Sequence, residues 1–160
     1  MHELILYATP TGPLAQACAK YFSDVAPTTA QAYPPHVTLT GFFHRRDPAA
    51  AVDAASGIDA VPPRSVEVRG LICNDDWIGL EIGSVWLESV TASFAERTPP
   101  AVGEDDIRCK DWLHLSLAYG IADLAAHAAR ARAEIDPAAG VGWEVALWER
   151  LDGDRWTRLS

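Results

Sequence analysis

The chain has 160 residues, of which 49% are hydrophobic and 22% are charged, a balance typical of a globular protein and unlike a disordered or fibrous one. Thirteen basic against twenty-two acidic residues give a net charge of −9. This charge disfavours a long nucleic-acid partner, because duplex binding depends on many lysine and arginine contacts to phosphate. A small phosphorylated ligand is still compatible with this net charge. The length of the chain predicts one domain over residues 1–160.

The sequence shows no sign of export, membrane insertion or metal binding. It has no basic N-terminal segment before a long apolar one, and no run of about 18 apolar residues. Its three cysteines, Cys18, Cys73 and Cys109, are odd in number and lack CxxC spacing, which argues against disulfides and structural zinc. We therefore expect a cytoplasmic monomer without a membrane partner, metal or other cofactor.

The first half of the chain predicts alternating strands and helices. An apolar run at residues 3–8 predicts a strand, and apolar residues at three- and four-residue spacings over 14–25 predict an amphipathic helix. Two prolines then lead into residues 36–43, which alternate like a strand. An alanine-rich helix is predicted over 49–56, and a hairpin is predicted from two strands within 65–82.

The second half continues this pattern. A helix is predicted over 85–97, a strand over 112–119 and a further helix over 123–135. Residues 143–156 predict two strands around an Asp-Gly-Asp turn at 152–154. The side chains that we expect the 85–97 helix to bury are Val85, Leu87, Val90 and Phe94.

Two of the predicted strands carry the same residue pattern, His-Val-Thr-Leu at 36–39 and His-Leu-Ser-Leu at 114–117. Because side chains alternate along a strand, each histidine shares a face with the hydroxyl two residues later, and the apolar residues share the other face. Each of these strands follows a helix. The repeat predicts two sheet-bearing halves related by an approximate two-fold axis, with a polar cleft between them.

Two imidazoles and two hydroxyls are suited to chemistry on a phosphate. Imidazole has an ordinary pKa of about 6.5, so one ring can take a proton from an attacking water while the other protonates the departing oxygen. Serine and threonine hydroxyls can donate hydrogen bonds to the non-bridging phosphate oxygens, where charge builds in the transition state. This scheme needs no metal.

The segments PPHVTLTGFF at 34–43 and WLHLSLAYG at 112–120 resemble the paired H-x-T-x and H-x-S-x motifs of the 2H phosphoesterase superfamily. The likeness is greatest to its cyclic phosphodiesterase and RNA-ligase-like branches. It implies a bilobal α+β fold, with two antiparallel β-sheet lobes and outer helices around a central cleft. It also implies metal-independent hydrolysis of a small cyclic phosphate, either a 2′,3′-cyclic nucleotide or ADP-ribose 1″,2″-cyclic phosphate.

The resemblance assigns roles to four residues. His36 and His114 take the catalytic positions, and Thr38 and Ser116 take the phosphate-binding positions. The chain is compact for this family, which favours a small nucleotide substrate over tRNA. Which histidine acts as acid and which as base is open.

Aromatic side chains near the motifs are candidates for stacking on a base or ribose, with core packing as the alternative. Trp112 is the preferred candidate because it shares the face of His114 and Ser116. Alternation places Tyr119 on the opposite face, so it can stack only if the strand end bends. Further residues considered for the cleft are Tyr7, Thr9, Tyr33, Phe42, Trp77 and Lys110.

Four alternatives are left open. The histidines could be structural, or they could bind a metal, although no HxH or HExxH pattern supplies a third ligand. The protein could be a 2′,5′-phosphodiesterase or ligase acting on RNA ends. It could also be a nucleotide-binding module without catalysis, but binding alone does not require two proton-transfer groups.

Overall fold

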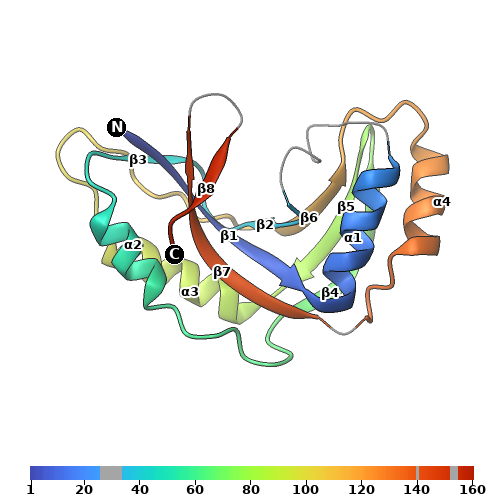
Figure 1. The fold of residues 1–160 in the computed structure, drawn as a ribbon, viewed down its shortest axis with the longest axis horizontal. Helices are drawn as coiled ribbons and strands as arrows, with labels where there is room; N and C mark the ends of the chain where they lie inside the picture. Colours follow the sequence, from blue (N-terminus) through green and yellow to red (C-terminus); the bar gives the residue numbers. More distant parts are fainter. Residues whose placement is uncertain (26–33, 140, 152–154) are drawn as a thin grey trace.

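The computed structural model describes residues 1–25, 34–139, 141–151 and 155–160. Over these residues the chain forms four helices and one antiparallel sheet of eight strands, in the order β4-β5-β6-β2-β1-β7-β8, with β3 paired to β1 (Figure 1). This is an α+β fold, as the sequence predicts. None of the helices in these ranges is long and apolar enough to cross a membrane.

The predicted helices and strands occur, with bounds that differ by a few residues. The strands are β1 (His2–Thr11), β2 (Val37–Thr38), β3 (Phe43–Arg45), β4 (Glu67–Asn74), β5 (Trp77–Gly83), β6 (Leu113–Ala118), β7 (Gly142–Arg150) and β8 (Trp156–Arg158). The helices are α1 (Gly12–Asp24), α2 (Ala49–Ser56), α3 (Val85–Arg97) and α4 (Leu124–Glu134). The turn expected at 152–154 lies outside the described residues.

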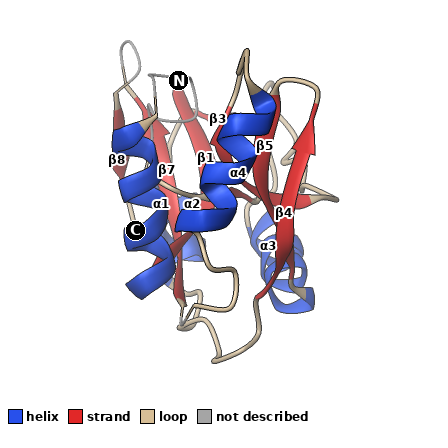
Figure 2. Cartoon of the chain, turned by 90° about the vertical axis from the view of Figure 1, so that its right-hand side faces the viewer, coloured by secondary structure: helices blue, strands red, loops and turns tan. Residues whose placement is uncertain are grey.

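The sheet bends into two arms that meet where β2 pairs with β6 (Figure 1). One arm contains β4, β5 and β6, and α1 and α4 lie next to each other on its outer side (Figures 1 and 2). The other arm contains β1, β3, β7 and β8, and α2 contacts both β7 and α3. The two predicted lobes correspond to these arms, and the β2–β6 hydrogen bonds join them into one continuous sheet.

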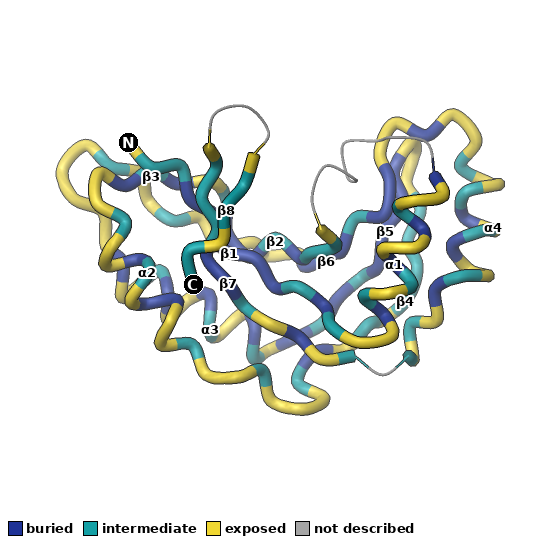
Figure 3. Tube along the Cα trace, viewed as in Figure 1, coloured by how far each residue is buried: buried dark blue, intermediate teal, exposed yellow. Residues whose placement is uncertain are grey.

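The buried side chains lie between the sheet and the helices. Leu4, Leu6 and Ala8 on β1 form one cluster with Leu14 and Cys18 on α1. Figure 3 shows burial following β1 and β5, whereas the outer turns of the helices are exposed. The helices of the described ranges leave the other side of the sheet uncovered, and this is therefore the side available for a site.

The predicted strand over 36–43 is interrupted. Leu39 donates its backbone N–H to Leu6, and the Thr40 hydroxyl accepts the N–H of Leu6 at 3.0 Å. The next backbone bonds go instead to a different loop, from Lys110 N–H to Leu39 and from Gly41 N–H to the Arg108 carbonyl. Alternation places Val37 and Leu39 in the core correctly, but it places Thr40 on the open face with His36 and Thr38, and this is wrong. Thr40 is buried because the segment changes hydrogen-bonding partners here, before β3 begins.

The predicted burial on α3 is partly wrong. Leu87 and Phe94 are buried as expected, but Val85 is 81% exposed. Val85 directly follows Ser84, the N-cap whose hydroxyl accepts the Leu87 N–H, and this start turns Val85 away from the sheet. The buried position is taken by Thr91, which is tolerated there because its hydroxyl donates to the Leu87 carbonyl at 2.7 Å. Val90 is half-buried.

Candidate active site

The register between β2 and β6 brings the two sequence motifs together. Val37 lies opposite Leu115, and both side chains are fully buried on the helix side of the sheet. In an antiparallel pair the residues on either side of such a pair also lie opposite each other, with their side chains on the other face. We call this the motif face. The half-buried residues that the register places on it are His36, Thr38, His114 and Ser116.

Within this group each histidine lies opposite the hydroxyl of the other motif, His36 opposite Ser116 and His114 opposite Thr38. The two histidines therefore occupy a diagonal, for which the backbone separation is about 7–8 Å. Two imidazoles on such a diagonal can reach one phosphate from two sides. The arrangement of these four residues is nearly symmetric, which matches the two-fold repeat expected from the sequence.

The backbone orients the His36 ring. Its Nδ1 lies 2.7 Å from the Pro34 carbonyl oxygen, which can only accept, so we assign the neutral ring a proton on Nδ1 and a lone pair on Nε2. The Tyr7 ring packs against the imidazole with centroids 4.0 Å apart. Burial lowers the pKa of His36, the Pro34 hydrogen bond opposes this, and the charge of His114 lowers the pKa further.

His114 lies against two tryptophans. Its ring centroid is 4.2 Å from that of Trp112 and 5.2 Å from that of Trp77, the latter at 88°. Its buried Nδ1 has no acceptor at hydrogen-bond geometry among the described residues. Burial lowers the pKa of His114, and this is the largest effect; the charge of Lys110 lowers the pKa further. The Trp112 backbone carbonyl raises the pKa of His114, as the Pro34 carbonyl does for His36.

Ser116 is held by two aromatic side chains. The Trp77 Nε1–H donates to the Ser116 Oγ at 3.1 Å, and the Tyr119 hydroxyl lies 2.6 Å from the same oxygen. Simple alternation places Tyr119 on the opposite face, and this expectation is wrong. Ile78 pairs with Ala118 while Gly79 pairs with Ser116, so β6 has one extra residue, a β-bulge that shifts the alternation by one position.

A glycine makes room for Trp77. A Cβ on Gly79 would lie 2.4 Å from the Trp77 ring and 2.7 Å from the Leu115 carbonyl oxygen. The indole therefore lies directly over Gly79 and from there reaches Ser116. The sequence marks Trp77 only as a candidate for stacking. Its W-x-G spacing, on a strand that pairs with a motif strand, is the signal that could have indicated its contact with Ser116.

We expect Gly79→Ala to destabilise the fold by about 1–3 kcal/mol, because the added methyl group must displace the indole or the neighbouring strand. Urea unfolding measures this change. Gly41→Ala is the matched control, since a Cβ at Gly41 would meet nothing closer than the Arg108 carbonyl oxygen at 3.8 Å. Equal stability of the two variants would contradict the close packing of Trp77 over Gly79.

The other residues considered from the sequence are distributed around the motif face. Trp112 is 43% exposed beside His114, and Tyr7 is buried opposite Thr38. Phe42 stacks on Trp156 with centroids 5.5 Å apart. Thr9 is half-buried, with its hydroxyl 3.4 Å from the Glu144 carbonyl oxygen. Tyr33 lies outside the described residues.

One charged pair beside the motifs was not expected from the sequence. Glu81 on β5 lies directly opposite His114, and its carboxylate is 3.8 Å from the Arg69 guanidinium. Arg69 is the extra residue of a bulge between Val68 and Gly70 on β4. Among the described residues, no group of three or more His, Cys, Asp or Glu side chains is arranged to hold a metal ion.

Comparisons of the chain with protein-family models, with curated proteins and with solved structures found no match. The motifs and the geometry of this face are therefore the basis for assigning a function.

Proposed function

We propose that this protein is a metal-independent phosphodiesterase that hydrolyses a small cyclic phosphate, a 2′,3′-cyclic nucleotide or ADP-ribose 1″,2″-cyclic phosphate. The observation that carries the proposal is the β2–β6 register, which brings two histidines and two hydroxyls to one face of the sheet. His36 and His114 are the acid/base pair, and Thr38 and Ser116 bind the phosphate. Structural histidines would not require this matched arrangement.

The reaction is an attack of water on phosphorus. The Nε2 of one neutral histidine takes a proton from water as the new P–O bond forms. The Nε2–H of the other, protonated histidine gives its proton to the ribose oxygen as the ring P–O bond breaks, and the product is a phosphomonoester. The ring that acted as base then releases its proton to solvent, and the ring that acted as acid takes one up, which restores the starting state.

The lowered pKa values of the two histidines limit how many protons the pair of rings holds. Burial lowers both pKa values, and the charge of His114 lowers the pKa of His36 further, so protonating both rings together is disfavoured. The singly protonated pair contains one acid and one base, which is the state that the reaction requires. The orientation of the substrate decides which ring has which role.

Counting hydrogen bonds indicates how Ser116 serves the phosphate. A hydroxyl has one proton and two lone pairs, and the Trp77 N–H occupies one lone pair of Ser116. If Tyr119 donates to Ser116, the serine proton is directed to the phosphate; if Ser116 donates to Tyr119, the phenol proton takes that place. In either arrangement the two hydroxyls together supply one donor to a non-bridging oxygen, where it stabilises the transition state.

The pH dependence of turnover tests the shared proton. With chelator present, we expect a bell-shaped profile of kcat/KM whose maximum lies on the acid side of about pH 6.5, because both histidine pKa values are lowered. Activity falls at low pH as the base is protonated, and at high pH as the acid loses its proton. A rate that rises steadily into the alkaline range would contradict the mechanism.

A further inference from the structure

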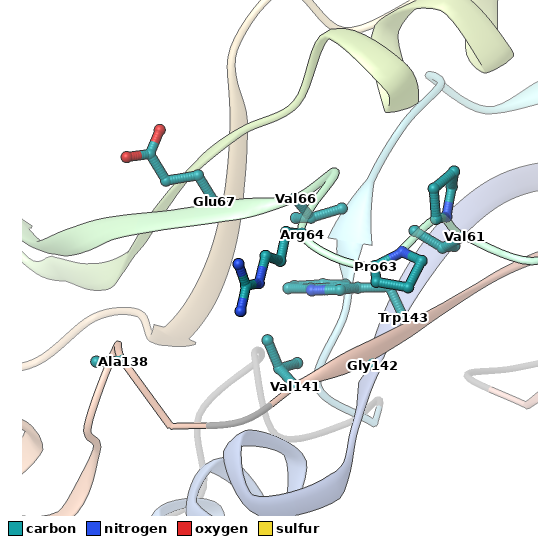
Figure 4. A pocket seen from close by; sticks show the side chains of 10 residues that line it. Val61, Pro63, Arg64, Val66, Glu67, Ala138, Val141, Gly142 and Trp143 are labelled. Carbon is teal, nitrogen blue, oxygen red and sulfur yellow. The ribbon is translucent and has the colours of Figure 1, made fainter.

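A pocket separate from the motif face lies where the two connections that cross between the arms come together. One connection runs from α2 to β4 and the other from α4 to β7, and each contributes lining residues at the start of its strand (Figure 4). The pocket has a volume of about 560 Å³, within the range of small-molecule sites, and none of the four motif residues lines it.

Arg64 is presented to this pocket by a rigid turn. The Ser65 backbone N–H and hydroxyl both donate to the Pro62 carbonyl, and the Ser65 carbonyl in turn accepts the Ser84 hydroxyl at the start of α3. Arg64 has a φ of 61°, a left-handed conformation that favours glycine. The arginine therefore has a conformational cost at this position, which a bound anion would offset.

The Arg64 guanidinium is exposed and forms no ion pair with any residue in the described ranges. The other charged lining residue, Glu67, is already paired with Arg69, with the guanidinium Nε 3.5 Å from its carboxylate. The pocket thus contains one uncommitted cation. Because the whole chain carries a charge of −9, binding of an anion here depends on this local donor.

Trp143 supplies a second hydrogen-bond donor. It lines the pocket and is 8% exposed, and its buried Nε1–H has no acceptor among the described residues. In Figure 4 the indole extends toward the Arg64 guanidinium. The exposed arginine side chain can turn onto a ligand and open access to this N–H, so both donors can reach one anionic group.

The remaining lining selects the kind of anion. Val61, Pro63, Val66 and Val141 give the pocket apolar walls. A guanidinium and one indole N–H match the two oxygens of a carboxylate, whereas a phosphate dianion would meet only one cation with Glu67 nearby. We infer that this pocket binds a small organic carboxylate with an apolar body, held by Arg64 and the indole N–H of Trp143.

The probe for this site is 4-(trifluoromethyl)benzoate, with the uncharged 4-(trifluoromethyl)benzamide for comparison. Titrating the ¹⁵N-labelled full chain follows the indole N–H signals of its six tryptophans, and Trp143→Phe identifies the relevant one. We expect the benzoate to shift the Trp143 signal in a saturable way at millimolar concentrations or below. The benzamide should bind at least about tenfold more weakly, because it lacks the charge.

Two variants test the role of the arginine. Arg64→Gly should weaken benzoate binding at least about tenfold while raising the thermal midpoint, since glycine accepts a φ of 61° without strain. Arg132→Gln, which removes an exposed positive charge on α4 outside the pocket, should leave benzoate binding unchanged. The inference is overturned if the Trp143 signal shows no saturable shift, if benzamide binds equally well, or if Arg64→Gly retains wild-type affinity.

Discussion

Replacing either His36 or His114 with alanine should lower kcat for cyclic phosphate hydrolysis by about 10² to 10⁴, the usual contribution of one positioned proton-transfer group. Substrate binding should change much less, because Thr38 and Ser116 still face the phosphate. Initial rates at saturating substrate, together with equilibrium binding of a non-hydrolysable nucleotide, separate the two effects.

The double variant distinguishes a catalytic pair from two independent groups. If the histidines act as one unit, removing the second should cost little more than removing the first. His44→Ala is the matched control, because this histidine pairs with Asp105 at 2.6 Å and lies opposite Glu3, four positions along β1 from Tyr7, the residue opposite Thr38. The assigned roles would be contradicted if His36→Ala or His114→Ala kept a kcat near that of the wild type.

Ser116→Ala should lower kcat by about 10² to 10³ with a smaller change in KM, as for the loss of one donor that acts mainly in the transition state. The substitution also leaves the Trp77 N–H without its acceptor. Steady-state kinetics with a 2′,3′-cyclic nucleotide measures both parameters. An increase in KM alone would mean that Ser116 binds substrate and transition state equally.

A variant of Trp77 tests whether the indole N–H orients the Ser116 hydroxyl for catalysis. Trp77→Phe keeps an aromatic ring over Gly79 but removes the N–H, so kcat should fall by less than in Ser116→Ala, and the two effects should not add. Trp86→Phe makes the same change on α3, away from the motif residues, and should retain wild-type kcat. Additive effects of Trp77→Phe and Ser116→Ala would contradict the coupling.

Local patterns predicted most of the secondary structure and the faces of the motif strands. Alternation is enough to place His36 with Thr38 and His114 with Ser116, because a strand has a period of two residues wherever its ladder is regular. The α3 pattern predicted Leu87 and Phe94 correctly but not Val85, since the N-cap at Ser84 sets the direction in which the first residue points.

The parts that could not be predicted depend on pairing between distant segments. No local pattern indicates that Val37 lies opposite Leu115, although this register brings the two motifs together. The bulge that turns Tyr119 toward Ser116 depends on the pairing of β6 with β5, and it becomes visible only when both strands are in place. The motif residues themselves were identifiable because their pattern occurs twice in the chain.

The most direct measurement is a phosphorus NMR spectrum of the purified protein with EDTA, 2′,3′-cyclic nucleotides and ADP-ribose 1″,2″-cyclic phosphate. We expect the cyclic phosphate signal of at least one substrate to convert to that of a phosphomonoester at the same rate with and without EDTA, and the single His36 and His114 variants to convert it about 10² to 10⁴ times more slowly. Turnover that stops with chelator would contradict metal independence. Bound but uncleaved substrate would contradict the enzyme assignment and favour a nucleotide-binding module or activity on RNA ends.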